Sequence, residues 1–145
     1  MYRNIICPID GSELGDLALE QAAYISKISN AKLIVLYVLD KWYKARDVAS
    51  ESPEWEAVHQ EWLDEGKKII NERKALLERE GCRNFEMVER DGDIAYEIIG
   101  LALELRAELI VMASHRYSPV GKLFHGSTID SVTKRSPCPV LWVFK

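Results

Sequence analysis

Paired cysteines and clusters of metal ligands are missing from this chain of 145 residues. Its three cysteines are odd in number and widely spaced, with no Cys-x2-Cys pair, and its three histidines lack the spacing of a metal cluster. This usage argues against a disulfide framework or a structural zinc site, and it fits a reducing cytoplasm. We therefore expect a cytoplasmic protein with no bound metal. The six residues are Cys7, Cys82, Cys138, His59, His115 and His125.

Long apolar runs and an excess of positive charge are missing as well. No run approaches the ~20 apolar residues that a membrane span needs, and the first residues lead into a strand without the pattern of a signal peptide. The net charge of -4 argues against binding to nucleic acid or to an anionic membrane. The length suits one domain with a proper core, and we expect that domain to span residues 1–145.

The motifs of common enzymes are also absent. The sequence has no Walker Lys-Ser/Thr pair and no nucleophile elbow. Asp10 has the oxygen atoms to hold a metal ion, but no second carboxylate is placed beside it by spacing. We therefore predict no catalytic residue and reject an enzyme, such as a nucleotide hydrolase, as the main interpretation.

Apolar runs alternate with helical patterns along the whole chain. The runs predict strands buried on both faces, and apolar residues at helical spacing predict helices between them. Strands are expected at 4–9, 32–39, 85–88, 109–112 and 140–144, and helices at about 14–29, 54–80, 94–105 and from 126 onward. This alternation demands right-handed crossovers, so it predicts an α/β fold: a five-stranded parallel sheet with helices on both faces. The third strand alternates apolar and polar residues, which suggests a sheet edge.

The helix at 54–80 is unusually long, about 40 Å, and carries Trp55 and Trp62 on one apolar stripe. Two interpretations remain open. The tryptophans pack on the sheet edge, which we favour, or together with Trp42 they cap a ligand cleft or join a partner. Gly66 is expected to mark a bend, and the alternating charges of residues 67–80 are interpreted as a solvated helix face.

Two regions suit a ligand. In open parallel sheets, ligands sit beyond the carboxyl ends of strands, near the point where the strand order reverses, and Asp10 and Val38 fall at such ends. Asp10 is either a turn residue that holds Gly11 by a local hydrogen bond or a ligand-facing group. Residues 126–128 predict a helix start capped by Ser127, and the same features suit a phosphate. From these residues alone, simple capping is favoured.

Four stretches resemble the universal stress protein family, and the resemblance runs from end to end of the chain. They are residues 5–12 (IICPIDGS), 91–95 (DGDIA), 107–112 (AELIVM) and 137–143 (PCPVLWV). The resemblance implies a doubly wound, Rossmann-like sheet with strand order 3-2-1-4-5. It also implies an adenine nucleotide, ATP or AMP, as candidate ligand. A homodimer is implied in which the last strand pairs antiparallel with its two-fold mate.

The chain departs from the family at the nucleotide motif. Nucleotide-binding members carry Gly-x2-Gly-x9-Gly-Ser after the fourth strand, and here Ala113 and Arg116 replace the first two glycines. Glycine permits a close phosphate approach that other residues resist, whereas the fork of an arginine suits a phosphate. We expect a dimeric stress-response regulator, not an enzyme, with a degenerate site and weak or no ATP binding. The alternative is an ATP-binding member that uses Arg116 in place of the glycine.

The resemblance implies a site with two sides. The residues are Pro8, Ile9, Asp10 and Val38 on the base and ribose side, and Met112, Ala113, Arg116, Gly126, Ser127 and Thr128 on the phosphate side.

Overall fold

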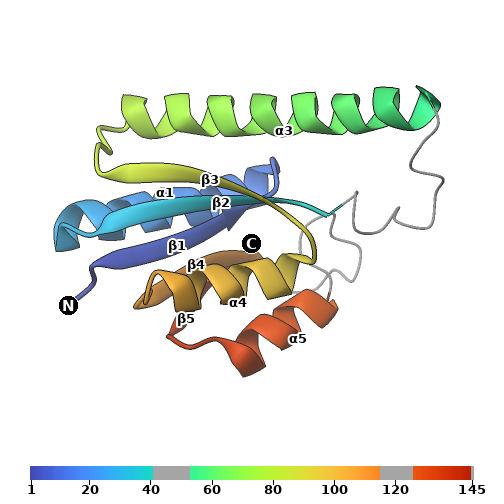
Figure 1. The fold of residues 1–145 in the computed structure, drawn as a ribbon. Helices are drawn as coiled ribbons and strands as arrows, with labels where there is room; N and C mark the ends of the chain where they lie inside the picture. The colour runs from blue at the N-terminus through green and yellow to red at the C-terminus, as the bar shows by residue number, and fades with distance from the viewer. Residues whose placement is uncertain (41–52, 115–125, 145) are drawn as a thin grey trace.

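The computed structural model describes residues 1–40, 53–114 and 126–144, with the side chains of residues 126 and 127 excepted. Strands and helices alternate along this part of the chain (Figure 1). The strands are β1 (Asn4–Ile9), β2 (Lys32–Leu39), β3 (Phe85–Asp91), β4 (Leu109–Ser114) and β5 (Val140–Phe144). The helices are α1 (Glu13–Ser29), α3 (Pro53–Arg79), α4 (Ile94–Glu104) and α5 (Gly126–Arg135).

The strands form a five-stranded sheet in the order β3-β2-β1-β4-β5, and every neighbouring pair is parallel. The predicted fold class and strand order are therefore confirmed. β3 is longer than predicted and continues to Asp91, because its backbone keeps pairing with β2 as far as Leu39. Its polar side chains do not interrupt this pairing, since β3 lies at the sheet edge, as the sequence suggested.

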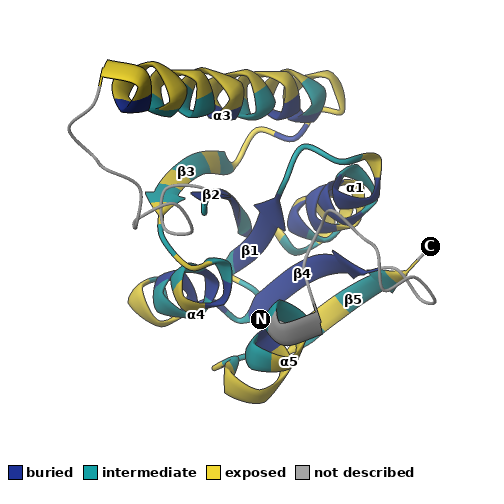
Figure 2. Cartoon of the chain, turned by 90° about the vertical axis from the view of Figure 1, so that its right-hand side faces the viewer, coloured by how far each residue is buried: buried dark blue, intermediate teal, exposed yellow. Residues whose placement is uncertain are grey.

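The helices cover both faces of the sheet. α1 and α3 lie side by side on one face, where the Lys27 ammonium donates a hydrogen bond to the Glu80 carbonyl just after α3 (3.0 Å). α4 packs against α5, and Figure 2 shows α1 and α4 on opposite sides of the sheet. Because both faces are covered, the central strands are mostly apolar, as expected for a parallel sheet.

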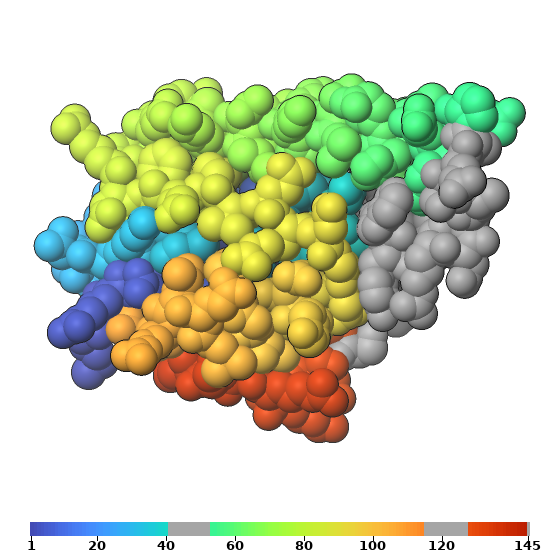
Figure 3. All heavy atoms as spheres, in the orientation of Figure 1, coloured from blue at the N-terminus to red at the C-terminus, as the bar shows by residue number. Residues whose placement is uncertain are grey.

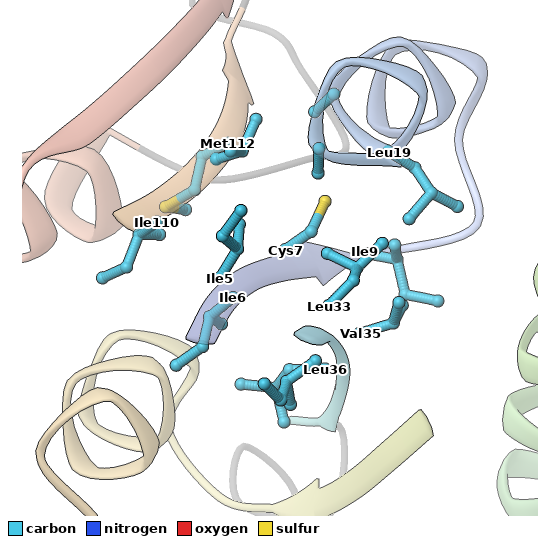
Figure 4. Packing of buried hydrophobic residues seen from close by; sticks show 14 of the residues in the cluster. Ile5, Ile6, Cys7, Ile9, Leu19, Leu33, Val35, Leu36, Ile110 and Met112 are labelled. Carbon is cyan, nitrogen blue, oxygen red and sulfur yellow. The ribbon is translucent and has the colours of Figure 1, made fainter. Parts of the chain in front are cut away.

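β1 runs through the middle of the core. Alternate side chains of a strand point to opposite faces, and Figure 4 shows Cys7 pointing toward Leu19 of α1 while Ile6 points to the face where α4 lies. Ile5, Ile6 and Cys7 are fully buried. Burial strongly raises the pKa of the Cys7 thiol, so this cysteine stays a neutral, inert member of the core.

Most helix ends follow their predicted signals. Ser12 is the N-cap of α1 and accepts from the Gly15 amide (3.0 Å), and Asp93 caps α4 in the same way through the Tyr96 amide (3.0 Å). Asn30 ends α1 in the left-handed conformation, with φ 58°. The start of α5 differs from the prediction: the helix begins at Gly126, so Ser127 lies inside its first turn and not at the cap position.

α3 carries the two tryptophans of the predicted stripe. Trp55 is buried, stacks on His59 (ring centroids 6.2 Å apart) and meets Trp62 edge to face (5.8 Å). Trp62 packs against the core, in agreement with the favoured packing interpretation. Trp42 lies outside the described residues, so its predicted role is not addressed.

Gly66 is a point of close contact and not the expected bend. α3 runs straight through this position (Figure 1). A Cβ atom added at Gly66 would lie 2.9 Å from Cε1 of Tyr37 and 3.3 Å from Oε1 of Glu89. The glycine therefore lets α3 approach the β2 and β3 side chains more closely than any other residue would.

Replacing Gly66 by alanine tests this contact. Alanine favours a helix by roughly 0.5–1 kcal/mol, but overpacking commonly costs about 1–3 kcal/mol, so we expect Gly66→Ala to lower the free energy of unfolding by about 1 kcal/mol. Gly100→Ala in α4 is the matched control, because no heavy atom lies within 4 Å of its added Cβ. Urea unfolding should show a loss for the first variant and a small gain for the second. A gain in both would mean that Gly66 is not a close contact.

Candidate functional site

The strand order reverses between β1 and β4, in the middle of the sheet. The ladder between β1 and β2 has six residue pairs, whereas that between β1 and β4 has two and ends at Ile6–Ile110. β1 and β4 both continue past this pair toward their carboxyl ends. This is the switch point at which ligands of open α/β sheets sit.

The predicted site residues meet at this edge from three neighbouring strands. Pro8 and Ile9 end β1, Val38 lies near the end of β2, and Met112 and Ala113 lie in β4. All but Pro8 belong to the hydrophobic core cluster, so these positions form a rigid floor rather than a set of exposed polar groups.

The phosphate side of the predicted site is only partly described. Thr128 lies in the first turn of α5 and is half-buried. Gly126 and Ser127 are the first two residues of the helix, which keeps the predicted helix N-terminus in place after β4. Arg116 lies outside the described residues. The effect of the replaced glycine therefore stays a prediction.

Asp10 stands directly after β1 and makes a local turn. Its Oδ1 atom accepts a hydrogen bond from the Ser12 amide (2.9 Å), which is the turn contact that the simpler interpretation expected. Within the described part of the chain, Oδ2 of Asp10 receives no hydrogen bond. Asp10 can therefore hold the turn through one oxygen and present the other to a ligand, so the two interpretations are compatible.

Gly11 is required at the tip of this turn for two reasons. Its φ of +86° lies in the left-handed region, which residues with a side chain rarely adopt. An added Cβ would also lie 2.9 Å from Cδ1 of Ile69 on α3. The turn after β1 is thus packed directly against α3.

Arg73 of α3 is the site feature that the sequence interpretation missed. It was taken as part of a solvated face, but the residue is only 9% exposed. Its Nε donates to Asp16 Oδ1 (2.9 Å), and its Nη2 donates to Asp16 Oδ2 (3.1 Å) and to the Gly11 carbonyl (2.8 Å). The sequence does contain a signal for the burial of Arg73: it follows Ile69 by one helical turn and so lies on the same inward-facing stripe of α3.

Carboxylates from several elements influence Tyr37 on the β2 side of the site. Burial first, and then the carboxylates of Glu65, Asp40, Glu89 and Asp10, raise the pKa of Tyr37 to about 12. Tyr37 therefore stays a neutral phenol at physiological pH. The sequence did not predict that Glu65 and Glu89 influence Tyr37, because they belong to α3 and β3 and are distant from Tyr37 in the chain.

A groove of about 710 Å³ lies elsewhere, between α4 and α5. It is bordered by Tyr96 and Leu103, two exposed apolar residues, and by Arg135 of α5. Figure 3 shows the face on which α4 and α5 meet. Of the predicted site residues that the structure describes, none lines this groove.

Metal ligands do not gather in the part of the chain that is described, where no group of three or more His, Cys, Asp or Glu residues could hold an ion. Among the same residues, no helix is long and apolar enough to cross a membrane.

Comparisons with known proteins identify relatives over the full length. A family model described as the universal stress protein family matches residues 1–143. Universal stress protein MJ0531 of Methanocaldococcus jannaschii is 32% identical over 146 residues, covering 100% of this chain and 84% of the relative. A solved structure, universal stress protein UspA from Lactobacillus plantarum, is 27% identical with a TM-score of 0.75, covering 98% of this chain and 97% of the other.

A further solved structure shares the fold and carries a ligand. It is a universal stress protein in complex with cAMP, 22% identical to this chain, with a TM-score of 0.69. The alignment covers 99% of this chain and 97% of the other. At this identity, the likeness concerns the fold alone.

Proposed function

Because the chain belongs to the universal stress protein family, we propose that it is a homodimeric regulatory protein with a degenerate adenine-nucleotide site. In this proposal the site binds ATP weakly or not at all, and the protein acts through binding and not through catalysis. The observation that carries the proposal is the replacement of two motif glycines by Ala113 and Arg116 beside an otherwise retained switch point.

The base and ribose side supports a retained nucleoside site. Asp10 stands at the carboxyl end of β1 with Oδ2 unbonded within the described residues. A ribose hydroxyl can donate a hydrogen bond to a carboxylate oxygen. A structural neighbour carries cAMP, so the fold accommodates an adenine nucleotide in at least one relative. We therefore propose AMP or ATP as the ligand class.

In this proposal, the affinity for nucleotide is lost on the phosphate side of the site. A side chain at position 116 restricts the backbone and occupies space that a glycine leaves open. The alternative remains that Arg116 contacts the phosphate with its guanidinium, which would compensate for the lost backbone contacts.

Arg116→Gly separates these alternatives in calorimetric titrations with ATP. We expect the variant to bind ATP more tightly than the natural protein, because glycine restores backbone freedom in front of Gly126. Ala113→Gly serves as the control, since removing one methyl group should change ATP binding little. Tight binding by the natural protein that weakens in Arg116→Gly by about 1.5–3 kcal/mol would favour the alternative.

The proposed dimer rests on β5. This strand pairs with β4 on one side and is the last strand of the described sheet. Leu141 and Phe144 are 39% and 49% exposed. An apolar strand at the edge of a sheet invites pairing with another chain. Antiparallel pairing with a second copy about a two-fold axis would cover this edge and its exposed side chains.

Trp142→Pro should abolish the dimer, because proline removes a backbone donor from the free edge of β5. The Ile110 amide donates to the Pro139 carbonyl, so in this parallel register the Trp142 amide points away from β4. Size-exclusion chromatography with light scattering measures the outcome, and circular dichroism checks that the fold is retained. Phe144→Asp provides a second test that leaves the backbone donors intact. Leu103→Asp, at an exposed apolar residue of α4, is the control and should remain dimeric. A folded Trp142→Pro variant that is still dimeric places the interface elsewhere.

A further inference from the structure

One peptide unit of the site is held from both sides. The unit joins Gly11 to Ser12. Its carbonyl accepts a hydrogen bond from Nη2 of Arg73 (2.8 Å), and its amide donates to Oδ1 of Asp10 (2.9 Å). In a trans peptide the carbonyl and the amide lie in one plane and point in opposite directions. Fixing one of them therefore fixes the direction of the other.

We propose that Arg73 is a positioning residue of the nucleotide site, which sets the Gly11–Ser12 peptide and through it the carboxylate of Asp10. For its ligand, this inference rests on the proposed function. A residue from α3, distant in the sequence, would thus determine how Asp10 meets the base and ribose of a nucleotide.

The glycine explains why such support is needed. Gly11 has no Cβ, so the peptide planes beside it rotate more freely than those beside other residues. Its φ of +86° is one of several values open to a glycine. Without an external bond, the Gly11 carbonyl would sample other directions, and the Ser12 amide would leave Asp10 with it. Arg73 removes this freedom.

The arginine is itself firmly placed. Its two bonds to the Asp16 carboxylate form a bidentate pair with the first turn of α1, and its Nη1 donates to Glu72 (3.1 Å). The Arg73 side chain is only 11% exposed, so water competes weakly for these bonds. Bidentate geometry of this kind fixes direction as well as distance. The guanidinium can therefore act as a rigid support between α3, α1 and the turn.

Two variants separate positioning from simple stabilisation. Arg73→Met and Asp16→Asn both remove the ion pair, but only Arg73→Met removes the bond to the Gly11 carbonyl. Arg79→Met makes the same chemical change at an exposed position of α3 and is the baseline. Arg73→Lys is the second variant in case Arg73→Met does not fold. It keeps the charge for Asp16 but lacks the fork that reaches Asp16 and Gly11 together.

The first readout is the amide proton resonance of Ser12 in nitrogen–proton NMR spectra, because a hydrogen bond to a carboxylate moves this resonance downfield. Relative to Arg79→Met, we expect an upfield shift in Arg73→Met and in Arg73→Lys, and a smaller one in Asp16→Asn, where Arg73 loses one anchor but keeps its bond to the Gly11 carbonyl. The second readout is the affinity for AMP, titrated up to millimolar concentration. It should fall roughly tenfold in Arg73→Met, the loss expected for one charge-assisted hydrogen bond, and fall less in Asp16→Asn.

An unmoved Ser12 resonance in Arg73→Met would overturn the inference. Equal changes in Arg73→Met and Asp16→Asn would also overturn it, because Arg73 would then act only through its ion pair. A natural protein that does not bind AMP would contradict the retained nucleoside side of the proposed function. In that case the Ser12 resonance alone decides whether Arg73 sets the turn.

Discussion

The burial of β1 on both faces is the constraint on which the rest of the structure depends. Ile5, Ile6 and Cys7 are inaccessible to solvent, so helices must cover both sides of the sheet and each crossover must return the chain to a parallel strand. The chain leaves this apolar strand at Ile9 and must satisfy its polar backbone groups at once. The Asp10–Gly11–Ser12 turn does so, and it lies where the strand order reverses. The position of the candidate site therefore follows from the core.

The same turn links three layers of the molecule. Asp10 and Ser12 cap the passage from β1 to α1, while Arg73 ties the turn to α3. Ile69 closes over Gly11 from the same helix. The turn that holds Asp10 is thus in direct contact with α3 as well as with α1.

Much of the fold could be predicted from local patterns. Continuous apolar runs located β1, β2 and β5, and Ser12, Asn30 and Asp93 marked helix ends through hydrogen bonds made within a few residues. These features depend on near neighbours in the sequence, so a single sequence contains them. The resemblance to a family added the strand order, which the alternation of strands and helices alone left open.

The missed features all depend on partners distant in the sequence. In the sequence, Arg73 is one of many charged residues in a charged helix. Its partners, Asp16 of α1 and the Gly11 carbonyl of the turn, are known only from the structure. Gly66 was predicted to mark a bend, and its close contact with Tyr37 of β2 is visible only in the structure. The acidic surroundings of Tyr37 likewise need α3 and β3 in position. For the candidate site, the base and ribose side stays a prediction, whereas the contacts of Arg73 with the turn were not predicted.

The central claim is that the replaced glycines have weakened the phosphate side of the site. Mass spectrometry of small molecules released from the freshly purified, denatured protein tests this claim most directly, because nucleotide-loaded proteins carry their ligand through purification only when they bind it tightly. We expect ATP to be absent or far below one molecule per protomer. ATP recovered at close to one molecule per protomer would contradict it.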